Sequence, residues 1–364
     1  MSGSEILCEV RNKVALITLN RPEALNALSF EMLGELRRLL IAHSGDASVR
    51  AVLIGGAGDR AFCAGGDIRA LYQSFKDGGT LHRDFFIAEY PLDYLLHRYP
   101  KPYVALIDGI AMGGGMGLAQ ASKLRIVGDR TRIAMPEVAI GLFPDVGGSY
   151  FLSRLPGALG AYLALTGTQI RGADALYAQL ADVYLPAEAI ASLREDLSAL
   201  AWSGDARADL TRLVHARSAQ GLPAPSLSIL RPAIDAHFAQ SSVPAILESL
   251  KAETRAEYAD WAEQTVKLLN SRSPTMLAVT LRQLQRGKTM NLPDCFRMEL
   301  GMVQQCFVQG DFIEGVRALI IEKDNAPRWQ PARTDEVTEE MINAFFNVQW
   351  PRSIHPLSNM EGIL

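Results

Sequence analysis

The residues of this sequence that are best suited to chemistry lie in three loops rich in glycine or in carboxylates. The first loop spans residues 61–68, and Gly65 and Gly66 stand side by side within it. Paired glycines permit a positive φ and let a backbone amide approach a ligand closely. A simple turn would use the same residues, so this loop alone leaves both interpretations open.

The second loop, residues 108–117, contains consecutive glycines at 113–115, where a small-residue helix is expected to begin. Glycine inside a helix costs roughly 1 kcal/mol relative to alanine, so a run of glycines needs a reason. Free amides at a helix N-terminus carry partial positive charge and suit an anionic oxygen. A dinucleotide-binding G-x-G-x-x-G is excluded, because Leu118 occupies its last glycine position counted from Gly113. Close helix packing remains an alternative explanation of the triplet.

The third loop, residues 135–148, places two carboxylates, Glu137 and Asp145, in otherwise apolar surroundings. Carboxyl groups among apolar neighbours tend to have raised pKa values and are candidates for acid, base or nucleophilic roles. Asp145 has an alternative explanation as a helix cap, since a helix is predicted to begin near Gly147. Glu137 has no such alternative, so it is the stronger candidate of the two.

Short runs of β-branched and apolar residues predict the strands that position these loops. The predicted strands are residues 14–19, 50–55, 103–107, 124–127 and 183–185. The stretch 29–41 predicts a helix capped by Ser29. Its apolar face would carry Leu33, Leu36 and Leu40. The alternation of strands and helices predicts an α/β fold.

The character of the sequence changes after Pro186, where glycine-rich turns thin out and helical patterns continue to about residue 320. We therefore expect a core in residues 1–185 and a mostly helical C-terminal region in residues 186–364. No Ser/Gly linker separates the two regions, so the helical region is expected to pack on the core.

Composition and charge narrow the range of functions. The net charge of −4 and the pI near 5.9 argue against a general nucleic-acid binder. The cysteines and histidines show no metal-binding spacing, so neither a metal site nor a disulfide framework is predicted. No apolar run approaches the roughly 20 residues of a membrane span. The first residues resemble neither a signal peptide nor a transit peptide, which predicts a cytoplasmic protein.

With residues 20–22 and 25–28 upstream, the three loops resemble the crotonase (enoyl-CoA hydratase/isomerase) superfamily over residues 5–185. The resemblance implies a crotonase-like spiral of ββα turns that binds acyl-CoA. It also implies that the amides of Gly66 and Gly114 hold the thioester oxygen between them, as an oxyanion hole.

Within this superfamily the chain most resembles the 3-hydroxyisobutyryl-CoA hydrolase family, which implies a role in valine breakdown. The segments that carry this resemblance are residues 62–69, 135–148, 273–275, 314–318, 323–325 and 327–329. That family places a substrate-contacting glutamate before the strand at 103–107, and Glu89 matches it. From the sequence alone Glu89 would pass as a solvated helix residue. The implied substrate-binding residues are Glu89, Gly66, Gly114, Asp67 and Ile68.

The reaction is predicted from one missing side chain. Hydratases of the superfamily use two glutamates to position water, and here Gly117 stands at the first position while Glu137 fills the second. Attack on a thioester carbonyl needs only the oxyanion hole and one or two carboxylates. We therefore predict an acyl-CoA thioester hydrolase that acts on a short-chain 3-hydroxyacyl-CoA. Its predicted catalytic groups are Glu137, Asp145 and the amides of Gly66 and Gly114.

Two alternatives stay open, an enoyl-CoA hydratase or isomerase and a non-catalytic acyl-CoA binding protein. A serine hydrolase is disfavoured because the sequence contains no G-x-S-x-G. No cofactor is expected, since coenzyme A enters as part of the substrate. The resemblance also allows a homo-oligomer, because crotonase relatives commonly associate through their C-terminal helices.

Overall fold

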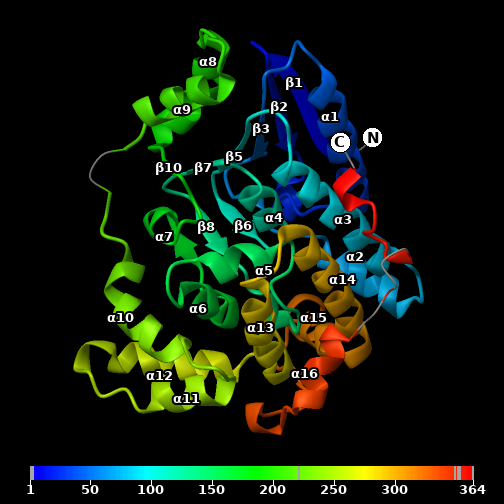
Figure 1. The fold of residues 1–364 in the computed structure, drawn as a ribbon, viewed down its shortest axis with the longest axis vertical. Helices are drawn as coiled ribbons and strands as arrows, with labels where there is room; N and C mark the ends of the chain where they lie inside the picture. Colours follow the sequence, from blue (N-terminus) through cyan, green and yellow to red (C-terminus); the bar gives the residue numbers. More distant parts are fainter. Residues whose placement is uncertain (1–3, 220–221, 348–349, 351–353, 363–364) are drawn as a thin grey trace.

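Two β-sheets form the centre of the protein, and helices surround them (Figure 1). The computed structural model describes residues 4–219, 222–347, 350 and 354–362. The larger sheet consists, in spatial order, of β1 (Ile6–Arg11), β2 (Val14–Leu19), β3 (Ala51–Gly56), β5 (Tyr103–Ile107), β7 (Leu124–Val127) and β10 (Val183–Tyr184). The smaller sheet consists of β4 (Ala61–Cys63), β6 (Ile110–Met112), β8 (Arg132–Ala134) and β9 (Ile170–Arg171).

Helices lie between the strands and predominate after residue 186. The helices before that point are α1 (Phe30–Gly45), α2 (Ile68–Lys76), α3 (Leu81–His97), α4 (Gly114–Gln120), α5 (Gly148–Phe151), α6 (Leu159–Thr166) and α7 (Gly172–Tyr177). Those after it are α8 (Ala187–Ala199), α9 (Ala206–Ala216), α10 (Ser226–Phe238), α11 (Val243–Lys251), α12 (Ala256–Asn270), α13 (Pro274–Gly287), α14 (Leu292–Gln309), α15 (Asp311–Val316) and α16 (Glu339–Phe346). Within the described ranges, no helix combines the length and the apolar character needed to cross a lipid bilayer.

The chain alternates between the two sheets as it proceeds. Each of β3, β5 and β7 enters the larger sheet, and the strand that follows it, β4, β6 or β8, enters the smaller one. Within each sheet these three strands run parallel to one another. Helices then return the chain, α2 and α3 after β4 and α4 after β6. This repeat is the predicted spiral of ββα turns, which the structure confirms.

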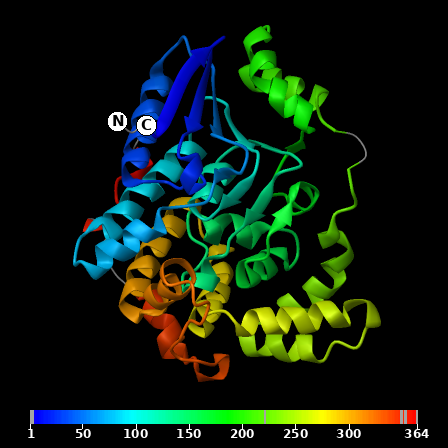
Figure 2. The same ribbon diagram turned by 180° about the vertical axis from the view of Figure 1, so that it is seen from behind.

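Both faces of the larger sheet are covered, which explains why every residue of β2 is buried. Val14 and Leu16 belong to a hydrophobic cluster with residues of α8 and α9 on one face. Ala15 and Ile17 belong to the main core on the other face. Successive side chains of a strand point to opposite faces, so a strand that is buried on both sides has no polar alternation. Figures 1 and 2 show α8 and α9 beside the larger sheet and away from α10, α11 and α12.

The later helices α13, α14 and α15 return to the core and pack against α3, α5, α6 and the third loop. One continuous hydrophobic cluster includes Ile17 of β2, Phe143 of the third loop, and Met276 and Phe296 of these helices. The helical region therefore shares its core with the α/β region. The boundary at residue 185 stays a prediction, because this cluster continues across it.

Strands β2, β3, β5, β7 and β10 lie where the sequence predicts strands, and Ser29 caps α1 by accepting a hydrogen bond of 3.1 Å from the N–H of Met32. The sequence analysis does not predict β1, β4, β6, β8 or β9. Four of these are only two or three residues long, too short to show a periodic pattern. The sequence predicts that the first loop directly follows the strand at 50–55, and this is wrong, because β4 lies within the loop and directly precedes its glycines.

Helix α15 touches the third loop backbone to backbone at two glycines. A Cβ added at Gly315 would lie 2.4 Å from the carbonyl carbon of Ile140. A Cβ added at Gly141, whose φ is +73°, would lie 2.2 Å from the carbonyl oxygen of Asp311. Real Cβ atoms do not approach backbone so closely, so both positions need glycine. The C-terminal region thereby fixes the segment that directly follows Glu137.

We predict that Gly315→Ala lowers the free energy of unfolding by about 1–3 kcal/mol, because the added methyl forces α15 away from the loop. The midpoint of urea unfolding measures this change. The matched control is Gly34→Ala in α1, where an added Cβ meets nothing within 4 Å. There we expect a gain of up to about 1 kcal/mol from helix propensity. Equal stabilities of the two variants would contradict the close contact.

Candidate active site

The three loops meet at one edge of the smaller sheet. Strands β4, β6 and β8 are parallel neighbours, with Ala61 paired to Ile110 and Ile110 paired to Arg132. Parallel strands end at the same edge of a sheet. The glycines of the first loop follow β4, those of the second loop follow β6, and the third loop follows β8. The sheet therefore brings together loops that are far apart in the sequence.

The first and second loops touch through their glycines. Gly65 and Gly113 both have positive φ, at +103° and +50°. A Cβ added at Gly65 would lie 3.2 Å from the carbonyl oxygen of Met112 and 3.4 Å from the nitrogen of Gly114. Side chains here would hold the two backbones apart, so the close approach depends on glycine.

The N–H groups of Gly66 and Gly114 are free to bind a ligand. Leu28 forms a bridge with Gly66, but the hydrogen bonds of that bridge use the carbonyl of Gly65 and the N–H of Asp67. Gly114 is the first residue of α4, where N–H groups have no partner inside the helix. Among the described residues, neither N–H has a hydrogen-bond acceptor. Both glycines line one cavity, which is the arrangement that an oxyanion hole requires.

This cavity of about 290 Å³ lies between the three loops, α3 and the short helix η4 (Arg317–Ile321). The predicted site residues that line it are Gly66, Ile68, Glu89, Gly114, Glu137 and Asp145. Much of the remaining wall is apolar and includes Phe85, Phe86 and Leu142. An apolar cavity with a few polar groups is typical of a small-ligand site.

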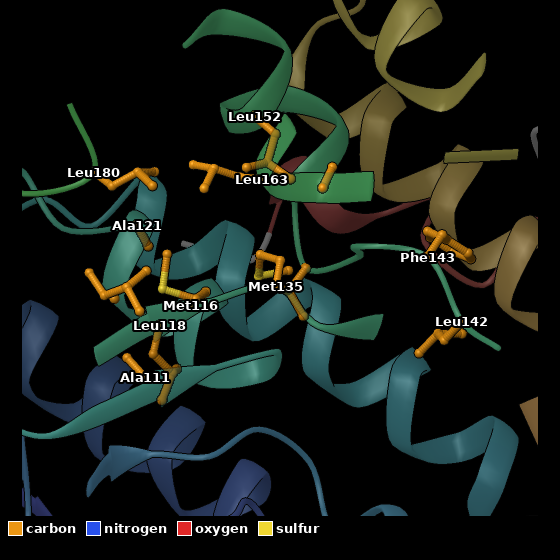
Figure 3. Close-up of a cluster of buried hydrophobic side chains, with 14 of the residues drawn as sticks. Ala111, Met116, Leu118, Ala121, Met135, Leu142, Phe143, Leu152, Leu163 and Leu180 are labelled. Atoms are coloured by element: carbon orange, nitrogen blue, oxygen red, sulfur yellow. The ribbon is translucent and has the colours of Figure 1, made fainter. Parts of the chain in front are cut away.

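Part of the apolar core lies around the second and third loops (Figure 3). It joins Met116 and Leu118 of α4 to Met135, Leu142 and Phe143 of the third loop. Closely packed side chains allow little movement of the backbone that carries them. This packing therefore fixes the second loop relative to the third.

Glu137 begins the short helix η2 (Glu137–Ile140) and is only 5% exposed. Its Oε1 would lie 3.2 Å from a Cβ added at Gly113, so the carboxyl lies beside the glycine triplet. Its Oε2 has no hydrogen-bond partner in the described part of the chain. Burial, together with the nearby carboxyl of Asp145, raises the pKa of Glu137 well above its usual value. The sequence predicts a poorly solvated carboxyl at Glu137, and the structure buries it.

Glu89 lies on α3 and is only 2% exposed. Its Oε1 would lie 2.3 Å from a Cβ added at Gly114, which places the carboxyl beside that glycine. Burial raises the pKa of Glu89 well above its usual value, and the carboxyls of Asp93 and Asp145 add to the rise. The reading of this residue as solvated is wrong, because α3 packs between α1, α4 and α14.

Asp145 accepts a hydrogen bond of 2.8 Å from the hydroxyl of Tyr90 on α3. Burial raises the pKa of Asp145 to about 6, although this hydrogen bond opposes the rise. The side chain does not cap α5. The amides of Gly147 and Ser149 at the start of α5 donate to the carboxylate of Glu299 instead. The capping explanation of Asp145 is therefore wrong.

Gly117 stands where hydratases of the superfamily carry their other glutamate, and the structure leaves no room for a side chain there. A Cβ added at Gly117 would lie 2.7 Å from Oδ2 of Asp93 and 2.8 Å from Cβ of Val146. Asp93 lies one helical turn after Glu89 and is fully buried, and its oxygens have no partner among the described side chains and backbone. Sequence analysis does not single out Asp93, because a lone acid in a helix is usually solvated.

Asp67 is the one predicted substrate-binding residue that does not line the cavity in the described structure. Its Oδ1 accepts a hydrogen bond of 3.2 Å from the N–H of Ala70 and caps α2. Its Oδ2 lies 3.1 Å from the guanidinium of Arg21. The carboxylate therefore supports the first loop from outside the cavity.

Two cavity residues, Leu319 and Ile320, come from the far end of the chain. They belong to η4, and Arg69 of α2 donates a hydrogen bond of 2.5 Å to the carbonyl oxygen of Ile320. The run of apolar residues at 318–321 resembles any core segment. No sequence signal identifies it as a wall of the site.

The family model described as enoyl-CoA hydratase/isomerase matches residues 14–346 of the chain. The chain belongs to the enoyl-CoA hydratase/isomerase family. The predicted resemblance is therefore confirmed, and the match extends through the helical region as well as the α/β core.

Relatives in this family resemble nearly the whole chain. The mitochondrial 3-hydroxyisobutyryl-CoA hydrolase of Gallus gallus is 42% identical over 347 residues, which cover 95% of this chain and 89% of that protein. The protein of the same name from Rattus norvegicus is 43% identical, covering 94% of this chain and 89% of its own. The crystal structure of a carnitinyl-CoA dehydratase from Mycobacterium thermoresistibile has a TM-score of 0.87 and is 39% identical, covering 98% of this chain and 99% of that chain.

We predict that Asp145→Asn stabilises the folded protein above pH 6. A carboxyl with a raised folded pKa favours folding below its unfolded pKa, and this contribution is lost as the pH rises through the folded pKa. With the pKa of Asp145 raised from 3.8 to about 6 in the folded protein, the wild type should lose stability as the pH rises from about 4 to about 6, and the variant should not. In urea unfolding at pH 8 we expect the variant to be more stable by about 1–3 kcal/mol, with a smaller difference near pH 5. A variant that is less stable by the same amount at both pH values would contradict the raised pKa.

Proposed function

We propose that this protein hydrolyses 3-hydroxyisobutyryl-CoA to 3-hydroxyisobutyrate and free coenzyme A. The observation that carries the proposal is the joint placement of two free glycine amides and buried carboxyls in one cavity. The names of the chicken and rat relatives, both 3-hydroxyisobutyryl-CoA hydrolases, support the choice of acyl group. The reaction consumes water and the thioester, and coenzyme A enters only as part of the substrate.

In this proposal the thioester oxygen binds between the N–H groups of Gly66 and Gly114. Attack on the carbonyl carbon moves negative charge onto that oxygen, and donors that are already in place stabilise the charge without reorganising. Loss of one such donor typically reduces turnover by about 10²–10³. Because both donors belong to the backbone, their position depends on the contact between the first two loops.

Glu137 is the proposed catalytic carboxylate. Its Oε2 has no partner among the described residues, and its Oε1 lies beside Gly113, the residue that precedes the second amide. It either attacks the thioester, so that an anhydride forms and the thiolate of coenzyme A leaves, or it removes a proton from the attacking water. Asp145, held by Tyr90, would orient the hydroxyl of the acyl group or exchange the proton.

Glu89 is proposed to contact the acyl group from the side of Gly114. Its raised pKa favours the neutral carboxyl, which can donate a hydrogen bond to an oxygen of the substrate. Ile68 supplies an apolar wall of the same cavity. Asp67 would act indirectly, by fixing the start of α2.

A hydratase or dehydratase is the second candidate, because the carnitinyl-CoA dehydratase structure is 39% identical to this chain. Such chemistry in this family uses a pair of glutamates, and Asp93 and Val146 leave no space for a side chain at Gly117. We therefore place hydrolysis first. A non-catalytic binding protein is less well supported, because buried carboxyls are costly to retain without a chemical role.

Location and assembly stay proposals. The chicken and rat relatives are named as mitochondrial proteins, whereas the sequence analysis predicts a cytoplasmic location for this chain. A homo-oligomer also remains a prediction.

The proposed function is tested by mixing the purified protein with 3-hydroxyisobutyryl-CoA and following free thiol with a chromogenic reagent. Crotonyl-CoA hydration is followed at the same enzyme concentration. We expect rapid release of coenzyme A and hydration slower by about 10²-fold or more, the usual contribution of a missing acid or base. Rapid hydration without thiol release would place the hydratase first.

A second prediction separates the two carboxyls of the third loop. Glu137→Gln keeps the shape but removes both the nucleophile and the base, so we expect kcat to fall by about 10³-fold or more. Asp145→Asn should reduce kcat less, by about 10–100-fold, if the aspartate orients the substrate. Steady-state kinetics on folded variants, checked by thermal melting, measure both effects. Wild-type turnover by a folded Glu137→Gln protein would remove Glu137 from the mechanism.

A single turnover in ¹⁸O-labelled water then distinguishes the two roles of Glu137. Label in the peptide that contains Glu137 indicates an anhydride that water opens at the enzyme carbonyl. Label only in the product acid indicates attack by water on the substrate carbonyl, directly or on the anhydride.

A further inference from the structure

The carboxylate of Glu299 on α14 holds the start of α5, directly after Asp145. Glu299 is fully buried, and its Oε2 and Oε1 accept hydrogen bonds of 2.9 Å each from the N–H groups of Gly147 and Ser149. These amides have no partner inside the short helix, because they lie in its first turn. A capping residue of the same loop would usually accept these hydrogen bonds. Here Glu299 accepts them from a distant part of the chain.

Gln283 on α13 holds the same segment through one residue before Asp145 and one residue after it. Its Nε2 donates a hydrogen bond of 2.6 Å to the carbonyl oxygen of Pro144 and one of 2.8 Å to the hydroxyl of Ser149. Gln283 is fully buried as well. The residue before Asp145 and the residues after it are thus bound to two C-terminal helices.

The segment between these contacts is strained. Val146 has a φ of +50°, a conformation that β-branched residues rarely adopt. Such a conformation persists only where surrounding contacts determine it. The side chain of Asp145 directly precedes this residue, and its Oδ2 must meet the hydroxyl of Tyr90 at 2.8 Å. A segment released from Glu299 would relax at Val146 and move the neighbouring carboxyl.

We propose that Glu299 is a positioning residue for the reaction, which holds Asp145 in the cavity through the amides of Gly147 and Ser149. Gln283 assists it through Pro144. The expected loss of turnover rests on the proposed function. The hold of Glu299 on the segment that follows Asp145 rests on the hydrogen bonds alone. The C-terminal helices would then determine the geometry of a carboxyl whose own loop belongs to the α/β core.

Glu299→Gln tests the proposal, because one of its two acceptor oxygens becomes an NH₂ group that faces a backbone N–H. We expect kcat to fall by about 10–100-fold while KM changes by less than about 3-fold, since a small displacement of a catalytic group affects turnover most. The matched control is Asp174→Asn. Asp174 is also buried and accepts hydrogen bonds from the N–H of Leu227 and the hydroxyl of Ser226, at the start of α10 and outside the cavity. The control should keep the wild-type kcat.

The decisive measurement repeats Glu299→Gln in an Asp145→Asn background. A residue that acts through Asp145 loses its effect when the carboxylate is already gone, so we expect a further loss of less than about 3-fold. A purely structural defect would reduce kcat by the same factor in both backgrounds. That result, or full turnover by a folded Glu299→Gln protein, would overturn the proposal.

Gln283→Leu provides a second variant, which removes the hydrogen bonds from Gln283 to Pro144 and Ser149 without changing a charge. It should reproduce the loss of kcat and the same dependence on Asp145, and it replaces Glu299→Gln if that protein fails to fold. Amide hydrogen exchange of residues 145–149 supplies a readout independent of turnover. Both variants should accelerate this exchange, and Asp174→Asn should not. If the wild type releases no coenzyme A, the proposed function is wrong, and unchanged exchange in the variants would separately refute the role of Glu299.

Discussion

The candidate site depends on a close contact between two stretches of backbone, made through two glycines that have positive φ. The first loop meets the second where a Cβ at Gly65 would lie 3.4 Å from the nitrogen of Gly114. The next glycines are enclosed on one side as well, Gly66 by Phe85 and Gly114 by Glu89. Their N–H groups nevertheless remain free on the side of the cavity. The fold thus fixes two donors that belong to the backbone, and the surrounding side chains select the chemistry.

Carboxyl groups gather around this contact without a compensating cation. The described residues that line the cavity include Glu89, Glu137 and Asp145 but no lysine, arginine or histidine. Asp93 lies just behind them. Burial raises the pKa of all three lining carboxyls, and neighbouring carboxyls add to the rise at Glu89 and Glu137. A cluster in which the pKa of Asp145 is about 6 can accept and return a proton near neutral pH.

Features that depend on neighbouring residues could be predicted from the sequence, and features that depend on contacts between distant residues could not. The glycine loops and Glu137 stand out by residue type and spacing, and the longer strands stand out by composition. The strands β4, β6 and β8 order the loops in space but are only three residues long. Glu89 could be proposed only from the family resemblance, because burial of α3 is a tertiary effect. Glu299 and Ile320 have no local signal, since their hydrogen bonds to the site region span 152 and 251 residues.

Because η4 forms one wall of the cavity, the cavity is complete only after the C-terminal part of the chain has been synthesised. During synthesis, every group proposed for chemistry leaves the ribosome before α13, α14 and η4 exist. A polypeptide that stopped short of α13 would carry the free amides and all the cavity carboxyls. It would nevertheless lack the acceptors that hold Gly147 and Ser149 and the apolar wall of Leu319 and Ile320. The C-terminal helices are therefore part of the candidate site, although none of their residues is proposed to touch the reacting atoms.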